Sequence, residues 1–139
     1  MASIIAYLTF DGRCREAMNF YKEAFGGELK IMTVGESPAA AQMPKDAHGL
    51  VMHADLRAEG LSLMASDNLG GPGPVTVGSA INLMANCSSE AEIRSIFPKL
   101  ARGGKVNSEL KVEFWGSLYG DLTDKFGLRW MLNFDMPKA

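Results

Sequence analysis

Few side chains in this sequence are of the types that bind metals or transfer protons. The 139 residues include only two histidines, His48 and His53. His48 lies in a stretch typical of a loop, where we expect it to be exposed. His53 lies in a strand-like stretch, and as a metal ligand it would need two or three partners from other strands. We find none at matching positions, so we interpret His53 as a strand histidine rather than as a ligand.

The two cysteines, Cys14 and Cys87, are the next candidates. Cys14 lies at the predicted start of a helix and beside two arginines, Arg13 and Arg15, a setting that lowers a thiol pKa. No histidine lies near it in the sequence to act as a base. We therefore interpret Cys14 as an incidental thiol rather than as a nucleophile.

Two groups near the C-terminal end have alternative interpretations. Asp121, Asp124 and Lys125 could serve acid–base chemistry, but their place around a predicted hairpin favours a turn in which Asp124 opens the turn and Lys125 is solvated. Trp115 and Tyr119 could form one wall of an apolar pocket. Packing in the core or at a dimer interface is an equally open interpretation of these two aromatic residues.

Composition limits the class of protein. Lys and Arg number 14, Asp and Glu number 16, and the net charge is −2, with no basic run to bind a row of phosphates. We therefore expect no nucleic acid partner. No apolar run approaches the roughly 20 residues that span a bilayer, so no membrane segment is expected. With two cysteines and no basic start typical of a signal peptide, the chain is predicted to be cytoplasmic.

The periodicity of apolar residues predicts two helices among strands. Helices are expected at 13–25, with Asp11 as N-cap, and at 89–101, with Ser88, Ser89 or Glu90 at the cap and Glu92 placed for a capping box. Pro98 should kink the second helix or end it early. Strands are expected at 3–10, 28–34, 50–57, 61–66, 77–87, 105–115, 117–123 and 128–135.

This order of elements, strand–helix–strand–strand–strand, occurs twice. A shift of 77 residues superposes Gly26–Gly27 on Gly103–Gly104, Phe20 on Phe97 and Ile4 on Ile81. Half of such a chain cannot easily bury both a helix and a sheet. We therefore predict one domain over 1–139, made of two βαβββ repeats (about 1–66 and 77–136) joined by a Gly/Pro-rich loop at 67–76.

Two segments resemble a known family. The opening Tyr7-Leu8-Thr9-Phe10-Asp11-Gly12-Arg13-Cys14-Arg15-Glu16-Ala17, with Phe25-Gly26-Gly27-Glu28, is similar to the start of PhnB-like proteins. The stretch Phe114-Trp115-Gly116, with Thr123-Asp124-Lys125-Phe126-Gly127 and Trp130-Met131, resembles their closing motif. These proteins belong to the vicinal oxygen chelate superfamily, which includes glyoxalases, bleomycin resistance proteins and dihydroxybiphenyl-type (extradiol) dioxygenases. The resemblance implies an α+β fold of paired βαβββ modules, with mixed curved sheets and helices on the outside, and a homodimer.

The superfamily also implies a divalent metal held by His and Glu on four strands. Carried over onto this sequence, the four ligand positions are Ile5, Met64, Ala80 and Met131. None of these side chains can bind a hard divalent metal. We therefore expect no metal and no other cofactor.

We predict instead a pocket for a small organic molecule, with an apolar lining to which methionines contribute. Its expected residues are Ile5, Tyr7, Met64, Ser66, Ala80, Asn82, Trp115, Met131 and Asn133. The glycine-rich stretch that ends at Gly73 leads into a predicted strand, whereas phosphate-binding loops lead into a helix. The methyltransferase label of some relatives is therefore not supported. The predicted function is a metal-free dimeric binding protein; the alternatives are a metal-dependent glyoxalase- or dioxygenase-type enzyme, and a dimeric scaffold without a ligand.

Overall fold

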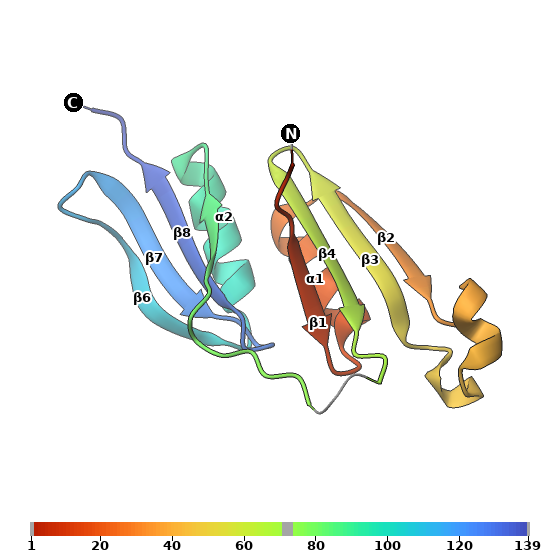
Figure 1. Ribbon diagram of the computed structural model, residues 1–139. Helices are drawn as coiled ribbons and strands as arrows, with labels where there is room; N and C mark the ends of the chain where they lie inside the picture. The colour runs from red at the N-terminus through yellow and green to blue at the C-terminus, as the bar shows by residue number, and fades with distance from the viewer. Residues whose placement is uncertain (1, 71–73, 139) are drawn as a thin grey trace. The chain divides into compact units, whose positions relative to one another are not determined.

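The computed structural model describes residues 2–70 and 74–138, and the chain divides into two compact units, residues 1–76 and 77–139. Each unit combines one long helix with one four-stranded sheet (Figure 1). Within the described residues, no helix is long and apolar enough to cross a membrane.

In the first unit, the sheet has the strand order β1-β4-β3-β2. Strands β1 and β4 are parallel, and the other neighbours are antiparallel. Two short 3₁₀ helices, Pro38–Gln42 and Lys45–Ala47, lie between β2 and β3. The remaining elements are β1 (Ala6–Phe10), α1 (Cys14–Phe25), β2 (Glu28–Thr33), β3 (Val51–Ala58) and β4 (Leu61–Asp67).

The second unit repeats this arrangement with the strand order β5-β8-β7-β6. Its first and last strands, β5 and β8, are again parallel. The predicted α+β fold of two βαβββ modules is confirmed by this topology. The elements are β5 (Leu83–Asn86), α2 (Glu90–Ala101), β6 (Lys105–Val112), β7 (Ser117–Thr123) and β8 (Arg129–Asp135).

Both predicted helices are confirmed, and three strands, β1, β5 and β6, are clearly shorter than predicted, while β2 and β8 each lose one residue. Strand β1 begins at Ala6 rather than at residue 3, and β6 ends at Val112 rather than at residue 115. Strand β5 is shortened most, because residues 77–82 are not part of it. Of the two effects expected of Pro98, a kink or an early end of α2, the early end is wrong, because the helix continues to Ala101. Pro98 has no N–H to donate to the carbonyl of residue 94, so one helix hydrogen bond is lost, and residues 99–101 still complete the last turn.

Each helix buries one face against its own sheet. In α1 the buried residues include Ala17, Met18 and Tyr21, all fully inaccessible, which pack over a sheet face that contains Ala54, Leu56 and Ala65. In α2, Ile93 and Leu100 are equally buried, and the sheet face below them contains Leu118, Leu122 and Leu132. Alternation along a strand places the intervening side chains on the opposite face, which we call the helix-free face of each sheet.

Two buried carboxylates fix the connections in the two units. Asp67, at the end of β4, accepts the N–H of Cys14 at the start of α1 (2.9 Å) and the N–H of Val51 at the start of β3 (2.9 Å). The expected cap Asp11 is not the N-cap of α1; that position is Arg13, whose side chain makes no capping hydrogen bond. A carboxylate distant in sequence therefore satisfies one of the unpaired N–H groups of this helix.

Asp124 plays the corresponding part in the hairpin between β7 and β8. Its Oδ1 accepts the N–H groups of Phe126 (2.9 Å) and Leu128 (3.0 Å), and its Oδ2 accepts the indole N–H of Trp130 (2.9 Å). The side chain is only 3% exposed. These bonds agree with the interpretation of Asp124 as a turn residue and not with an acid–base role.

Candidate functional site

Three of the four pocket residues predicted in the first unit lie together on its helix-free face. Tyr7 of β1 is directly paired with Met64 of β4, and Ser66 lies two residues further along β4. Tyr7 is 52% exposed. Ile5, the fourth, directly precedes β1 and is 39% exposed.

His53 of β3 is close to this group. Its Nδ1 lies 3.4 Å from the Tyr7 hydroxyl, and the two rings are tilted with centroids 5.9 Å apart. No set of three or more His, Cys, Asp or Glu side chains that could hold a metal occurs within residues 2–70 and 74–138. His53 therefore has an aromatic hydrogen-bonding partner, Tyr7, but it belongs to no group of metal-binding side chains in the described chain.

His48 is half-buried and not exposed as expected. Its Nε2 lies 2.9 Å from the carbonyl oxygen of Ala40 and 3.1 Å from that of Met43, in the segment of the two 3₁₀ helices. The sequence places His48 in a loop, but only the fold of that loop brings these carbonyl groups to the imidazole. His48 thus has a structural role within the loop.

The cysteine thiols are far from reactive. Burial, together with the negative charge of Asp67, raises the pKa of Cys14 to about 12. Burial, assisted by Glu92, raises the pKa of Cys87 to about 11. The expectation that helix start and arginines would lower the Cys14 pKa is wrong, because desolvation of a fully buried thiol outweighs them. Neither thiol is a thiolate at neutral pH.

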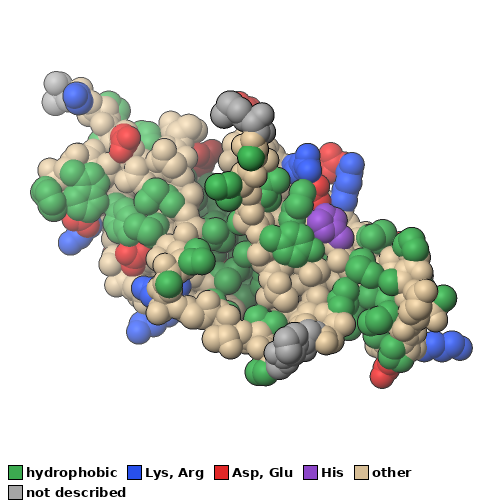
Figure 2. Space-filling model, in the orientation of Figure 1, with side chains coloured by type: hydrophobic (Ala, Val, Ile, Leu, Met, Phe, Trp, Pro, Cys, Tyr) green, Lys and Arg blue, Asp and Glu red, His purple; other side chains and the backbone are tan. Residues whose placement is uncertain are grey.

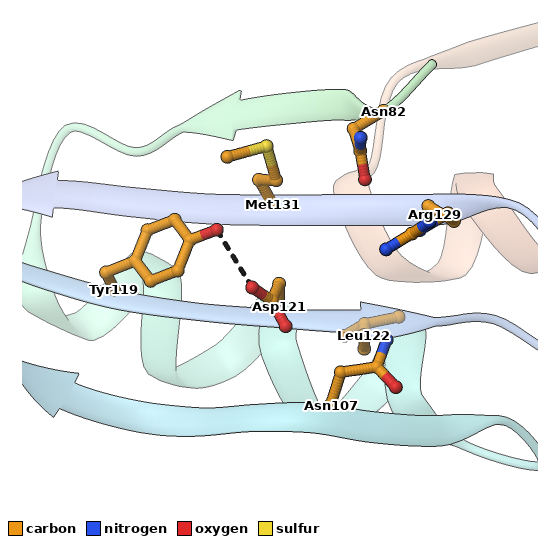
Figure 3. Close-up of a pocket in the computed structure, with 7 residues that line it drawn as sticks. All are labelled: Asn82, Asn107, Tyr119, Asp121, Leu122, Arg129 and Met131. Carbon is orange, nitrogen blue, oxygen red and sulfur yellow. Dashed lines mark hydrogen bonds between the residues drawn. The ribbon is translucent and has the colours of Figure 1, made fainter. Parts of the chain in front are cut away.

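A pocket of about 200 Å³ lies on the second unit (Figure 3). It is bounded by residues from β6, β7 and β8 and from the segment just before β5. The lining residues are Asn82, Asn107, Tyr119, Asp121, Leu122, Arg129 and Met131. Two of them, Asn82 and Met131, are among the predicted pocket residues.

The other predicted residues of the second unit lie outside this lining. Asn133 donates through Nδ2 to Asn86 Oδ1 (3.1 Å) and to Asp135 Oδ1 (3.2 Å), so its amide is engaged further along the sheet. Ala80 is exposed in the segment before β5. Trp115, in the turn between β6 and β7, is 53% exposed, so packing in the core is the wrong interpretation of this residue.

Trp115 nevertheless leads toward the pocket. Its ring lies 5.9 Å from the ring of Tyr119, a pocket residue, and 4.9 Å from that of Phe114, which is 96% exposed. Both contacts are edge-on, the geometry that aromatic pairs prefer. An aromatic row therefore runs from the exposed turn to the pocket lining. Hydrophobic side chains also reach the surface elsewhere on both units (Figure 2).

Hydrogen bonds orient the polar side chains of the pocket. The Tyr119 hydroxyl donates to Asp121 Oδ2 (2.9 Å), and Asn107 Nδ2 donates to Thr123 Oγ1 (3.1 Å). Arg129 donates through Nη1 to the carbonyl oxygen of Ser79 (3.2 Å). Desolvation, followed by the bond to Asp121, raises the pKa of Tyr119 to about 12, so the phenol is protonated at neutral pH.

Five of the seven lining residues are polar, so the lining of this pocket differs from the apolar lining that we predicted. Sequence reasoning considered Tyr119 and Asp121 separately, and it missed Asn107, Leu122 and Arg129. Alternation along β7 places Tyr119 and Asp121 on one face, which could have paired them. The alignment of β6 beside β7 depends on register shifts that no sequence pattern reveals.

The architecture identifies the fold class of the chain. The chain superposes on a glyoxalase/bleomycin resistance protein/dioxygenase from Nocardioides with a TM-score of 0.56, over 100% of this chain and 87% of that one, at 20% identity. At this identity the likeness concerns the fold, and it confirms the predicted paired-module fold of that superfamily.

Closer relatives identify the family. A family model described as 3-demethylubiquinone-9 3-methyltransferase matches residues 2–133. The chain is 32% identical to protein YjdN of Escherichia coli K12, with 91% of each covered. It is also similar to protein PA1353 from Pseudomonas aeruginosa (37% identity, TM-score 0.85, 99% and 100% covered) and to a PhnB protein from Bacillus cereus (29%, 0.72, 96% and 99%). The chain belongs to this PhnB and YjdN-containing family, as its motifs predicted.

Proposed function

We propose that this chain is a metal-free dimeric protein that binds a small organic molecule. The observation that carries the proposal is the pocket on the second unit, where side chains from three strands and one connecting segment meet around about 200 Å³. Concave sites with a few convergent polar groups are the usual places where proteins bind small molecules.

The superfamily's metal-dependent chemistry is the first alternative. At its four ligand positions this chain has Ile5, Met64, Ala80 and Met131, none of which is a ligand for a hard divalent cation. A cation placed among such side chains would lose its hydration without gaining charged ligands, which is strongly unfavourable. His53 with Tyr7 alone does not offer the three protein ligands that a catalytic zinc site uses.

The activity that the family description names, methyl transfer to a demethylubiquinone, is not part of the proposal. The common S-adenosylmethionine site lies where a strand leads through a glycine-rich loop into a helix. Here the glycine-rich segment follows β4, and the next element is the strand β5. Residues 71–73 of that segment lie outside the described residues. The remaining alternative is a scaffold without a ligand, and the presence of the pocket on the second unit argues against it.

Metal analysis together with native mass spectrometry of freshly purified protein tests the metal-free part. We expect less than stoichiometric zinc, nickel, manganese and iron after chelation. Stoichiometric metal that survives chelation and disappears in a His53→Ala variant would overturn it.

Binding is tested by screening fragment-sized organic molecules against ¹⁵N-labelled protein. We expect at least one to bind saturably and to shift the amide resonances of the pocket residues. Asn82→Ala should weaken that binding, whereas Asn19→Ala, on the exposed surface of α1, should leave it unchanged. A screen in which no molecule shifts the pocket resonances would favour the scaffold.

A further inference from the structure

The polar groups of the pocket are not distributed evenly. Arg129, Asn82 and Asn107 lie on one side, Tyr119 and Met131 lie on the other, and Asp121 lies between them (Figure 3). One side therefore offers cationic and amide groups, and the other an aromatic ring and a thioether. Such a division suits a ligand with a polar head and an apolar body.

Arg129 provides the positive charge of the polar side. A guanidinium has five N–H donors in a rigid fork, and within the described chain Arg129 uses Nη1 for the carbonyl oxygen of Ser79. That bond anchors the side chain and leaves further donors for a ligand. Because the fork matches the two oxygens of a carboxylate, a carboxylate is the head group that this residue favours.

The amides beside Arg129 support the same head group. Asn82 has no hydrogen bond to another described residue, so its amide N–H₂ is available to a ligand oxygen. Asn107 donates one Nδ2–H to Thr123, which fixes its side chain and leaves the second Nδ2–H for a ligand oxygen. Both groups can hydrogen-bond a polar ligand without adding charge.

Asp121 sets a second requirement. Its Oδ2 accepts the hydroxyl proton of Tyr119, while Oδ1 has no hydrogen bond among the described residues. The raised pKa of Tyr119, about 12, keeps that proton on the phenol, so the bond holds the carboxylate in place at neutral pH. A carboxylate oxygen can only accept, and it repels a ligand that presents nothing but negative charge. The ligand must therefore carry a hydrogen-bond donor beside its anionic group.

The apolar side extends beyond the lining itself. Met131 and the Tyr119 ring form the wall, and the Trp115 ring lies 5.9 Å from that of Tyr119. A thioether adapts to ligand shape, and aromatic rings stack on other rings at low entropic cost. A volume of about 200 Å³ is below the range of roughly 300–1,000 Å³ typical of drug-sized sites, so the ligand is small.

We propose that the pocket binds a small hydroxy carboxylic acid with an aromatic or similar apolar group. Arg129 and Asn82 hold the carboxylate, and Asp121 accepts a hydrogen bond from the hydroxyl group. Tyr119 and Met131 contact the apolar part. This inference rests on the proposed binding function and specifies its ligand class.

Three probes that differ by one group each test it in the wild-type protein. These are 3-phenyllactate, 3-phenylpropionate, which lacks the hydroxyl, and 2-phenylethanol, which lacks the carboxylate. Dissociation constants come from titrations followed by ¹⁵N–¹H spectra and by tryptophan fluorescence. We expect 3-phenyllactate to bind about tenfold or more tightly than either analogue, because hydrogen bonds to charged groups contribute about 1.5–3 kcal/mol.

Variants then assign each preference to a residue. Arg129→Gln should remove the preference for 3-phenyllactate over 2-phenylethanol, and Asp121→Asn should remove its preference over 3-phenylpropionate. Arg94→Gln, which removes one exposed positive charge from α2 in the same unit, should change neither preference. Circular dichroism checks that each variant is folded, and the wild-type comparison stands without them.

The outcomes separate the two proposals. Equal binding of the three probes, with shifts at pocket residues, would overturn the hydroxy acid while the binding function stands. No binding by 3-phenyllactate would also overturn it, and the fragment screen then decides on the binding function independently. A preference that persists in both Arg129→Gln and Asp121→Asn would show that other groups recognise the acid.

Discussion

Asp67 is a single side chain that joins three elements of the first unit. It ends β4, and its two oxygens hold the first residue of α1 and the first residue of β3. The side chain is 3% exposed, so water cannot replace these bonds if they are lost. A carboxylate also interacts favourably with the positive end of a helix dipole.

We expect Asp67→Asn to destabilise the protein by about 2–3 kcal/mol, because an amide can accept with one oxygen only and turns an N–H₂ group toward a backbone N–H. Urea denaturation measures the change as a lower midpoint at constant slope. Asp46→Asn is the control, since Asp46 is exposed in a 3₁₀ helix. Equal midpoints for the two variants would contradict the role of Asp67.

The buried thiols make stability depend on pH in alkaline solution. The pKa of Cys14 is about 12 and that of Cys87 about 11 in the folded protein, against an ordinary value of 9.0. At a pH between the ordinary pKa and the folded-state pKa, the thiols ionise in the unfolded chain but stay protonated in the folded chain. The free energy of unfolding therefore falls as pH rises above about 9.

Cys14→Ala should therefore flatten the fall in the urea midpoint between pH 9 and 11, even though the cavity it creates lowers the midpoint at every pH. Measurements at pH 8, 9.5 and 10.5 give the slope. A slope equal to that of the wild type would show that Cys14 ionises as readily in the folded state as in the unfolded one.

At the level of single residues, the sequence predicted part of the site. Asn82 and Met131 were found from the superfamily alignment, because that alignment needs only position along a strand. Arg129 and Asn107 were missed because their place depends on which strands are neighbours and in what register. Asp67 was missed as a helix cap because it is distant in sequence from Cys14.

Elements were predicted better than residues. Both helices have strong apolar periodicity and glycine stops, and their bounds agree closely with the structure. The capping box of α2 is confirmed in part: Ser89 Oγ accepts the N–H of Glu92 (3.0 Å), whereas Glu92 accepts the N–H of Ser88 (2.9 Å), one residue before the N-cap. Strand β5 was overestimated because the β-branched residues Val77 and Ile81 extend the apolar pattern, but residues 77–82 lack ladder partners.

The second of the two glycines after each helix allows the backbone to approach the sheet of the same unit closely. A Cβ at Gly104 would overlap the carbonyl oxygen of Thr123 and the backbone of Asp124, and one at Gly27 would lie 2.5 Å from the carbonyl oxygen of Arg57. Backbone atoms cannot move aside as a side chain can. The second glycine of each pair, Gly27 and Gly104, is thus explained by packing at equivalent places.

Gly104→Ala should cost about 1–3 kcal/mol through overpacking. Gly49→Ala is the matched control, because a Cβ at Gly49 has no atom within 4 Å in the described structure. Thermal unfolding of the two variants compares them directly. If Gly104→Ala were as stable as Gly49→Ala, the close approach of the two backbones would have to be relaxed in solution.

For the whole molecule, the repeat is the main result that the sequence predicted correctly. Adding 77 to the first residue of β1, Ala6, gives Leu83, the first residue of β5. Both sheets then follow the same neighbour order. Chain topology was predictable because it depends on the order of elements, which periodicity and glycine positions reveal.

We expect a homodimer. Each sheet has two edge strands, β1 and β2 in one and β5 and β6 in the other, and a helix-free face. Exposed edges and faces are commonly covered by association. Sedimentation equilibrium at micromolar concentration should give twice the chain mass of 15.0 kDa. A mass of one chain that persists on raising the concentration would argue for a monomer.

In each sheet the first strand of the unit pairs in parallel with the last one, and this pairing determines when a unit can be completed on the ribosome. Ala6 pairs with Leu63, so the first strand to be synthesised must wait for nearly the whole unit to emerge. Until then β1 is an unpaired apolar strand, and Asp67, the last residue of β4, is not yet present to hold α1. Stalled nascent chains that expose residues 1–60 should therefore be cut faster by protease than chains that expose residues 1–76, in which β1 and β4 can pair. Resistance of the shorter chains would show that α1, β2 and β3 fold without the strands that close the sheet.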